Sequence, residues 1–227
     1  MDIALILLAL PVILPLMGLV TLWIKLVSRG PVIYRQIRIG RDGRPFTLFK
    51  FRTMHANADA ASHIRHFDNL VQHNRPMVKM DLLCDSRLIP GGCLLRAAGI
   101  DELPQLLNIL RGEMSIVGPR PCLPEEYSYF TRIQLVRFHA LPGLTGIWQS
   151  QGKNLATFNE MNAMDASYVR HASPLLDLKI ICQTPRAVFA QVRLAYLRHR
   201  ASKVGARPLL PTAANPGFDG LSTQRLG

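Results

Sequence analysis

The chain has 227 residues, 48% of them hydrophobic, and its 27 Lys and Arg outnumber 15 Asp and Glu to give a formal net charge of +12. That length and apolar content suffice for one domain with appendages, and the charge predicts an anionic partner: nucleic acid, an anionic membrane surface or a phosphorylated substrate. No CxxC spacing or paired metal-ligand pattern is present, which argues against a cysteine-ligated metal module and for reduced thiols facing the cytosol at Cys84, Cys93, Cys122 and Cys182.

Residues 3–24 form an uncharged run long enough to cross a bilayer core. Fourteen of them are Leu, Ile or Val, which at roughly −0.4 kcal/mol each favours membrane insertion by about 6 kcal/mol. Pro11 and Pro15 lie in the middle of the run, and each removes a helical hydrogen bond and kinks the axis. Basic residues after Ile24 predict that the following domain lies in the cytoplasm.

Residues 25–52 carry eight Lys or Arg and a single acidic residue, Asp42. Within this segment, residues 32–39 and 46–51 are rich in β-prone residues and are joined by the turn sequence Gly40 to Gly43. This pattern predicts a β-hairpin, and its basic surface is suited to anionic lipid headgroups.

The next predicted element is a helix that begins at Asp101, a favoured N-cap residue, and tolerates Pro104 in its first turn. Gly112 is expected to end it. The helical spacing of four leucines predicts one buried face, formed by Leu103, Leu106, Leu107 and Leu110.

Asp101 and Glu102 are adjacent, so on a helix they point about 100° apart and suit two separate roles rather than a shared proton. A carboxylate can attack phosphorus, and a neighbouring carboxylate can hold Mg²⁺ together with substrate phosphates. The rigid turn Gly118 to Pro121 can present Arg120 to a phosphate. The alternative is that Asp101 only caps the helix, Glu102 complements its dipole and Arg120 lies on a surface turn.

Two later segments have an amphipathic character. Residues 127–140 are rich in aromatic side chains and suit either the membrane surface or packing against the core. Residues 186–203 alternate basic and apolar residues at helical spacing, which predicts an interfacial helix, whereas 204–227 has the composition of a disordered tail.

Three long stretches together resemble a known family. They are SRGPVIYRQIRIGRDGRPFTLFKFRTM at 28–54, DELPQLLNILRGEMSIVGPRP at 101–121 and PGLTGIWQSQGKN at 142–154. In this order they resemble the bacterial sugar transferases that act as polyprenyl-phosphate phosphoglycosyl transferases, and the resemblance extends from about Asp2 to Thr184. It implies transfer of a sugar 1-phosphate from a UDP-sugar to undecaprenyl phosphate, through a covalent phosphosugar intermediate on Asp101.

The resemblance also implies roles for further residues. Glu102, with Asp101, would hold Mg²⁺. Pro15, with Pro11, would break the membrane helix so that it re-enters the cytoplasmic leaflet, although an ordinary kinked span remains the alternative. The residues implied near the substrate phosphates are Lys50, Arg52, Arg96, Arg120 and Asp165. The chain departs from the family pattern at Leu14, where Ser is common, and at 97–100, where a Thr-Ser-Leu-like approach to the carboxylates is replaced by Ala-Ala-Gly-Ile.

The predicted organisation is an α+β protein of the bacterial inner membrane. It has a re-entrant membrane helix at 1–27, a cytoplasmic catalytic domain with a hairpin at 28–184, a basic interfacial helix at 185–203 and a disordered tail at 204–227. The expected partners are a UDP-sugar, undecaprenyl phosphate and membrane lipids; a homodimer stays open, and the sugar is not identified by any motif.

Two other function classes compete with this one. A membrane-tethered nucleic-acid binder would explain the charge but not the carboxylate pair, and no RRM, KH or zinc-finger signature is present. A catalytically inactive scaffold of a polysaccharide assembly complex is expected to lack Asp101 or Glu102, and this chain has both.

Overall fold

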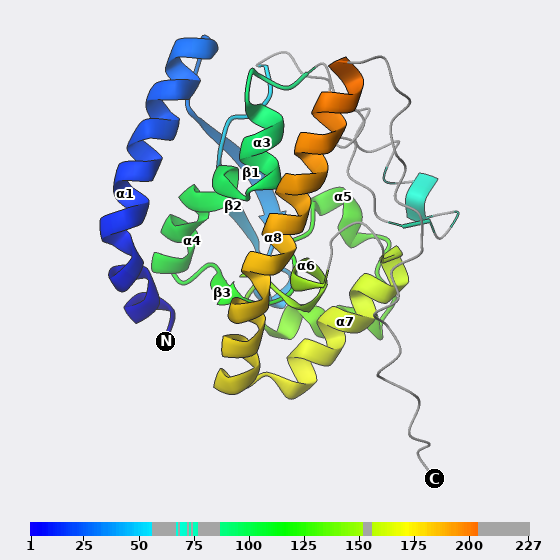
Figure 1. Cartoon of the computed structure of the whole chain (residues 1–227). Helices are drawn as coiled ribbons and strands as arrows, with labels where there is room; N and C mark the ends of the chain where they lie inside the picture. Colours follow the sequence, from blue (N-terminus) through cyan, green and yellow to red (C-terminus); the bar gives the residue numbers. More distant parts are fainter. Residues whose placement is uncertain are drawn as a thin grey trace.

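The structure is a computed structural model of the chain, and it describes residues 1–55, 67, 69–71, 73, 75–76, 87–151 and 156–203. Within these residues the fold is mainly helical, with two two-stranded sheets. Helix α1 runs along one side of the molecule, the long helix α8 crosses its front, and the hairpin lies between and behind them (Figure 1). The predicted α+β class, with its long apolar N-terminal helix, is confirmed.

The predicted hairpin is also confirmed. Strands β1 (Ile33–Ile39) and β2 (Pro45–Phe51) pair antiparallel, with Ile33 opposite Phe51 and Ile39 opposite Pro45. The 3₁₀ turn η1 (Arg41–Gly43) connects them, and both Asp42 and Gly43 have positive φ. Asp and Gly tolerate this left-handed backbone, which is why the sequence of the turn identified it.

A second, parallel sheet joins β3 (Ser115–Val117) to β4 (Gly143–Thr145), with Ser115 opposite Gly143 and Val117 opposite Thr145. The two strands meet at a close backbone crossing. A Cβ atom added to Gly118 would collide with the carbonyl oxygen of Leu141, and one added to Gly143 would collide with the backbone nitrogen of Gly118. The glycines of the two motifs are therefore required to bring the motifs together.

Helix α1 (Asp2–Val27) is continuous and packs along the domain over its whole length. Near its start, Ile6 packs in a cluster with Leu48 of β2, and near its end Ile24 packs in a cluster with Phe51. Its opposite face is apolar and exposed, and the helix is long and apolar enough to cross a membrane. Pro11 and Pro15 lie on exposed positions and do not interrupt the helix, so re-entry into one leaflet remains a prediction.

The segment around the carboxylates differs from its prediction in two respects. It begins as a 3₁₀ helix, η3 (Ile100–Gln105), and continues as α4 (Leu106–Leu110). Asp101 is not the N-cap, because Gly99 occupies that position with φ 69° and Asp101 lies inside the first turn. Gly112, with φ 73°, follows the end of α4 as expected.

The predicted leucine face is correct at Leu103 and Leu106 and wrong at Leu107 and Leu110. Leu107 and Leu110 are 44% and 49% exposed, whereas Ile109 is buried and Leu103 and Leu106 are partly buried. A 3₁₀ helix advances about 120° per residue instead of 100°, so one 3₁₀ turn shifts the direction of every side chain after it. An assumption of uniform α-helical spacing from Asp101 onward therefore assigned the buried face incorrectly.

The remaining helices surround these two sheets. Helix α7 (Phe158–His171) begins with a capping box between Thr157 and Glu160. The aromatic segment packs inward at Phe138, which is buried and lies edge-to-face with Phe130. The other elements are α3 (Gly92–Ala97), α5 (Pro124–Tyr127), η4 (Gln134–His139), α6 (Ile147–Ser150) and α8 (Pro174–Lys203).

Helix α8 extends without a break across the boundary drawn at 184/185. The predicted interfacial helix is thus the second half of a 30-residue helix whose first half packs against the domain at Ile180, a buried residue in a cluster with Val117. Residues 204–227, predicted to be disordered, lie outside the described residues.

Candidate active site

Asn108 fixes the carboxylate-bearing turn against the hairpin. Its side chain is fully buried, and its Oδ1 accepts a hydrogen bond from the backbone N–H of Phe49 at 3.1 Å. Its Nδ2 donates to the carbonyl oxygen of Thr47 at 2.7 Å and to Glu113 Oε2 at 2.6 Å. This buried amide ties α4 to β2 and so holds the preceding turn, with Asp101 and Glu102, beside the same strand.

Lys50, on β2, lies directly at this carboxylate pair. Its Nζ donates to Glu102 Oε1 at 3.2 Å, and both side chains are about one-fifth exposed. Burial lowers the pKa of Lys50, while the negative charges of Glu102 and Asp101 oppose that shift. Asp101 is 5% exposed. The structure therefore brings together Lys50, Asp101 and Glu102, as the sequence motifs predicted.

Two further cations act on Lys50. The charges of Arg38 and Arg96 both lower the pKa of Lys50, so their guanidinium groups lie within electrostatic range of its ammonium. Arg96, at the end of α3, donates to Thr53 Oγ1 at 3.3 Å. A group of three cations beside two carboxylates suits a ligand that brings several negative charges, such as a diphosphate.

Arg38 was not among the residues selected from sequence. It is 7% exposed on β1 and donates to Gln36 Oε1 at 2.8 Å and to the carbonyl oxygen of Pro121 at 3.2 Å. Burial, and secondarily the charge of Arg120, lower the pKa of Arg38 to about 10. The signal that could have identified it is strand alternation, because the hairpin register puts Arg38 and Lys50 on the same face.

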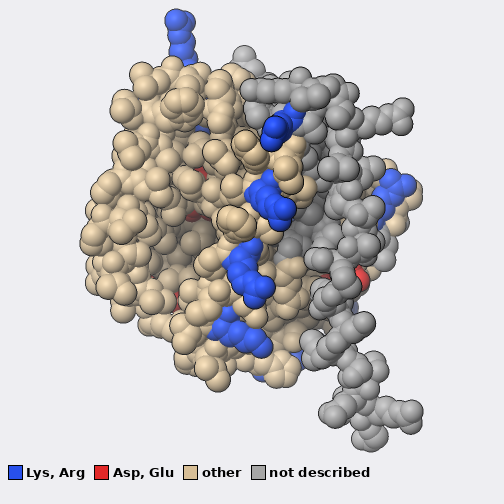
Figure 2. All heavy atoms as spheres, in the orientation of Figure 1, with Lys and Arg blue, Asp and Glu red and all other residues tan. Residues whose placement is uncertain are grey.

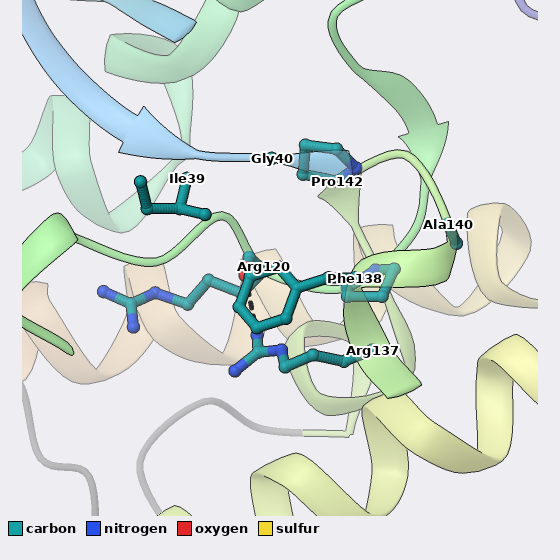
Figure 3. Close-up of a pocket in the computed structure, with 8 residues that line it drawn as sticks. Ile39, Gly40, Arg120, Arg137, Phe138, Ala140 and Pro142 are labelled. Atoms are coloured by element: carbon teal, nitrogen blue, oxygen red, sulfur yellow. Dashed lines mark hydrogen bonds between the residues drawn. The ribbon is translucent and has the colours of Figure 1, made fainter. Parts of the chain in front are cut away.

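The turn that carries Arg120 is held through its backbone. Arg137 Nη2 donates to the carbonyl oxygen of Arg120 at 2.7 Å, the bond drawn in Figure 3. The backbone N–H of Arg120 lowers the pKa of Asp165, opposing the effect of burial. Arg38 binds the next carbonyl, at Pro121. The carbonyl oxygens of residues 120 and 121 are therefore held by arginine side chains from two distant elements, η4 and β1.

Arg137 and Asp165 form a buried ion pair beneath this turn. Arg137 Nη2 lies 2.7 Å from Asp165 Oδ2, and both side chains are 1% exposed. Burial raises the pKa of Asp165 to about 6, and the charge of Arg137 opposes the shift. Arg137 Nη1 also donates to Asn162 Oδ1 at 2.7 Å. The resemblance implied that Asp165 lies near a substrate phosphate. In the structure its carboxylate pairs with Arg137 beneath the turn, and a direct contact with a phosphate remains a prediction.

The guanidinium of Arg120 extends away from that of Arg137 (Figure 3). It is about one-quarter exposed, lies 3.6 Å from Glu126 Oε2 and approaches the ring of Trp148 at 5.9 Å. The hollow in Figure 3, beside Ile39 and Pro142, holds about 10 Å³, which is room for roughly one water molecule. It is too small for a nucleotide sugar, so the candidate substrate groups are the cations and carboxylates around Lys50.

Arg52 lies elsewhere. Its guanidinium donates to Ser28 Oγ, to the carbonyl oxygen of Ser28 and to that of Arg29, and its Nε donates to the carbonyl oxygen of Pro31 at 2.6 Å. These contacts fasten the C-terminal end of α1 to β2. The structure gives Arg52 this anchoring role and does not group it with the cations around Asp101.

The carboxylates are suited to a divalent cation only together with a ligand. In the described part of the chain, no group of three or more His, Cys, Asp or Glu side chains could hold a metal ion by itself. Asp101 and Glu102 provide two neighbouring carboxylates, and Mg²⁺ commonly binds one or two carboxylates plus substrate phosphates. The residues present therefore fit Mg²⁺ that arrives with a diphosphate.

Comparison with known proteins identifies the family. A family model described as bacterial sugar transferase matches residues 1–191. The chain belongs to the bacterial sugar transferase family. The exopolysaccharide production protein ExoY of Sinorhizobium fredii is 38% identical over 187 residues, which covers 82% of this chain and 83% of that protein. The uncharacterized sugar transferase EpsL of Bacillus subtilis is 38% identical over 177 residues, 78% of this chain and 79% of that protein.

A relative with a fully stated reaction matches as well. The UDP-glucose:undecaprenyl-phosphate glucose-1-phosphate transferase of Caulobacter vibrioides is 40% identical over 178 residues, which covers 75% of this chain and 61% of that protein. The sugar transferase family predicted from the three motifs is therefore confirmed. The first two motifs contribute Lys50, Asp101 and Glu102 to the site, and the third places Trp148 beside Arg120.

Proposed function

We propose that this sugar transferase moves a sugar 1-phosphate from a UDP-sugar to undecaprenyl phosphate and thereby initiates exopolysaccharide assembly. The observation that carries the proposal is the group formed by Asp101, Glu102 and Lys50. Its two carboxylates are adjacent in the sequence, and the Nζ of Lys50 lies 3.2 Å from Oε1 of Glu102. The name of the Caulobacter vibrioides relative gives UDP-glucose and undecaprenyl phosphate as substrates, and the name of the Sinorhizobium fredii relative gives exopolysaccharide production, which supports the pathway. Retention of both carboxylates in one site argues against the inactive-scaffold alternative.

The reaction follows from the positions of these groups. A carboxylate oxygen of Asp101 attacks the phosphorus that bears the sugar, the bond from that phosphorus to the bridging oxygen breaks, and UMP leaves. A phosphate oxygen of the lipid then attacks the same phosphorus, forming the lipid diphosphate sugar and releasing the Asp101 carboxylate. Both steps bring anions together, so fixed cations contribute more than acid–base groups; Lys50, Arg38 and Arg96 supply that charge.

Mg²⁺ is the proposed cofactor. Glu102, with Asp101 beside it, would hold the ion, and Mg²⁺ would neutralise charge on the diphosphate. Lys50 and Arg120 keep separate roles: Lys50 orients Glu102 through the 3.2 Å contact, and Arg120 is held by its backbone so that its guanidinium can meet a phosphate.

The proposed location is the cytoplasmic face of the bacterial inner membrane. Helix α1 exposes an apolar face to which Leu8 and Val12 contribute, 78% and 74% exposed. Both of its ends are bonded to the catalytic domain, through Asp2 at the start and through Ser28 just after its last residue. These contacts support a helix that stays on the cytoplasmic side and inserts into one leaflet, rather than one whose N-terminus crosses the bilayer.

Helix α8 supplies a second surface suited to lipid headgroups. A basic residue recurs every seven positions on its exposed side, and Figure 2 shows a row of Lys and Arg along this helix. Exposed apolar residues accompany the row, with Phe189 and Tyr196 at 71% and 62% exposure. Such a combination favours an anionic membrane surface. The basic residues are Lys179, Arg186, Arg193 and Arg200.

UMP release by the full chain in lipid nanodiscs tests the proposal. The reaction would contain Mg²⁺, undecaprenyl phosphate and one of a panel of UDP-sugars, and formation of the lipid-linked product would be followed in parallel. Asp101→Asn should abolish turnover, because the amide is nearly isosteric but cannot act as an anionic nucleophile. Glu102→Gln should be severely impaired and should need more Mg²⁺. Asp42→Asn, an exposed acid in the hairpin turn, is the matched control.

A covalent adduct gives a second measurement. With UDP-sugar present and the lipid acceptor omitted, mass spectrometry of the wild-type protein should find a phosphosugar on the peptide that contains Asp101. Near-wild-type turnover by Asp101→Asn, or an adduct on another residue, would contradict the assignment. An unchanged Mg²⁺ titration in Glu102→Gln would move the metal site away from Glu102.

A further inference from the structure

Asp2, in the first turn of α1, reaches a strand more than a hundred residues away. Its Oδ2 accepts a hydrogen bond from Ser115 Oγ at 2.6 Å and another from the backbone N–H of Ile116 at 3.2 Å. Hydrogen bonds to a charged acceptor are stronger than neutral ones, and two donors converging on one oxygen fix its position. The membrane helix is thus bonded at its start to β3.

The Ile116 amide lies on the side of β3 that β4 does not use. Ser115 and Val117 are the residues of β3 that pair with β4, and the next strand bond is from the Gly118 N–H to the carbonyl oxygen of Thr145. In a parallel pair, alternate residues bond to the neighbouring strand, so the residue between them directs its N–H to the other side. Asp2 supplies the acceptor on that open edge.

Strand β3 leads directly into the turn that carries Arg120. Its last residue, Val117, accepts a hydrogen bond from the Tyr168 hydroxyl at 3.2 Å, and Arg120 follows three positions later. On the α1 side, Ile6 packs in a cluster with Met114, the residue that precedes the strand. A shift of Asp2 would therefore move β3 at Ile116. Because the chain runs from the C-terminal end of β3 directly into the turn, the same shift would move the backbone of Arg120.

We propose that Asp2 is a positioning residue that couples the membrane helix to the Arg120 turn through the open edge of β3. The proposal rests on the proposed transferase function and adds the residue by which the position of α1 acts on the site. At this end of the helix the two hydrogen bonds of Asp2 to β3 add to the packing of Ile6 against Met114.

The experiment compares Asp2→Ala, Asp2→Asn and Ser115→Ala in the full chain in lipid nanodiscs. Asp2→Ala removes the acceptor, so exchange of the Ile116 amide hydrogen should accelerate about tenfold or more, the factor for losing one charge-assisted hydrogen bond. Asp2→Asn keeps an acceptor oxygen and should give a smaller acceleration. Because Ser115 and Asp2 share one contact, the double variant Asp2→Ala/Ser115→Ala should exchange no faster than Asp2→Ala.

Kinetics separate positioning from simple loss of structure. A displaced Arg120 should raise the KM for the UDP-sugar at least threefold in Asp2→Ala, with partial recovery in Asp2→Asn. A merely destabilised enzyme would lose active molecules, which lowers kcat and leaves KM unchanged. The matched control is Asp42→Asn, which removes the charge of an exposed acid in the hairpin turn, keeps a residue that tolerates the positive φ there, and should alter neither measurement.

Three results would overturn the proposal: unchanged exchange at Ile116 in Asp2→Ala, a KM equal to that of the wild type, or equal effects of Asp2→Ala and Asp42→Asn. Failure of the transferase function itself would look different, because the wild-type chain would then release no UMP from any UDP-sugar. The exchange measurement uses no substrate and tests the contact between Asp2 and β3 in either case.

Discussion

Replacement of Arg137 by Leu should destabilise the protein strongly, because it leaves a buried carboxylate without its cation. Arg137 contacts Asp165 Oδ2, Asn162 Oδ1 and the carbonyl oxygen of Arg120, each at 2.7 Å. Removing one member of a buried ion pair costs about 3–5 kcal/mol, a large share of the 5–15 kcal/mol by which most domains are stable. For a chain of this size the expected fall in Tm is roughly 6–20 °C.

A double variant distinguishes the charge effect from the positioning effect. In Arg137→Leu/Asp165→Asn the buried charge is gone, so the free energy of unfolding should recover by more than about 1 kcal/mol relative to Arg137→Leu. Activity should stay low, because the carbonyl oxygen of Arg120 has still lost its donor. Stability and activity would therefore respond differently to the second substitution.

Thermal unfolding in nanodiscs and UMP release are the two assays. Arg132→Leu is the matched control, since Arg132 is an exposed cation in the same segment and its loss should change Tm by only a few degrees. The reasoning would be refuted if Arg137→Leu unfolded within about 1 kcal/mol of the wild type. It would equally fail if the double variant regained full turnover, because the backbone contact to Arg120 would then be dispensable.

Three further predictions concern Lys50, pH and the exposed leucines of α4. Lys50→Met removes the cation that lies 3.2 Å from Glu102. Initial-rate measurements should show kcat/KM for the UDP-sugar lowered roughly 100-fold, the usual effect of losing one charge-stabilising donor. A decrease of less than about threefold would exclude this role for Lys50. Protonation of Asp165, whose pKa is raised to about 6, should weaken the Arg120 clamp, so a pH profile should show activity falling below about pH 6, and Asp165→Asn should lack that limb. Because this pKa lies above the ordinary 3.8 of Asp, the folded state binds the proton more tightly than the unfolded one, and stability from this group should rise as pH falls from 6 to 4 while activity declines. Leu107→Ser/Leu110→Ser should weaken binding of the protein to anionic vesicles about tenfold or more at unchanged Tm. The comparison is Ile133→Ser, which alters another exposed apolar residue. Equal losses of binding in both variants would assign the effect to general hydrophobicity.

The elements predicted correctly are those whose cause is local. The hairpin follows from two β-prone runs and a turn with residues that accept positive φ. Asp101 and Glu102 could be selected because their chemistry depends on being adjacent to each other. Asn108 could not be selected, since in a leucine-rich helix an Asn suggests an exposed face, and its real role depends on Thr47, 61 residues away.

Sequence patterns alone did not show which arginines act at the site: Arg137 was overlooked, and Arg52 was wrongly grouped with the cations near Asp101. Arg137 resembles any basic residue of an amphipathic segment, and only the packing of α7 beneath the Arg120 turn reveals its three buried contacts. Arg52 shares a motif with Lys50, but β2 ends at Phe51, and the chain beyond the strand directs Arg52 to the end of α1. Motif membership therefore identified the neighbourhood of the site but not which cation faces it.

The 3₁₀ turn that invalidated the leucine prediction also links the chemistry to the membrane. It carries Asp101 at 5% exposure and, by shifting the direction of α4, leaves Leu107 and Leu110 exposed. At 1.5–2.0 Å of rise per residue, the six to nine residues that separate them from Asp101 span roughly 9–18 Å. Insertion of these leucines into lipid would hold Asp101, the proposed nucleophile, about one headgroup layer from the acyl chains, where a lipid-borne phosphate lies. The acceptor would then reach Asp101 without leaving the bilayer, and the same leucines that fail as core residues would determine the height of the site.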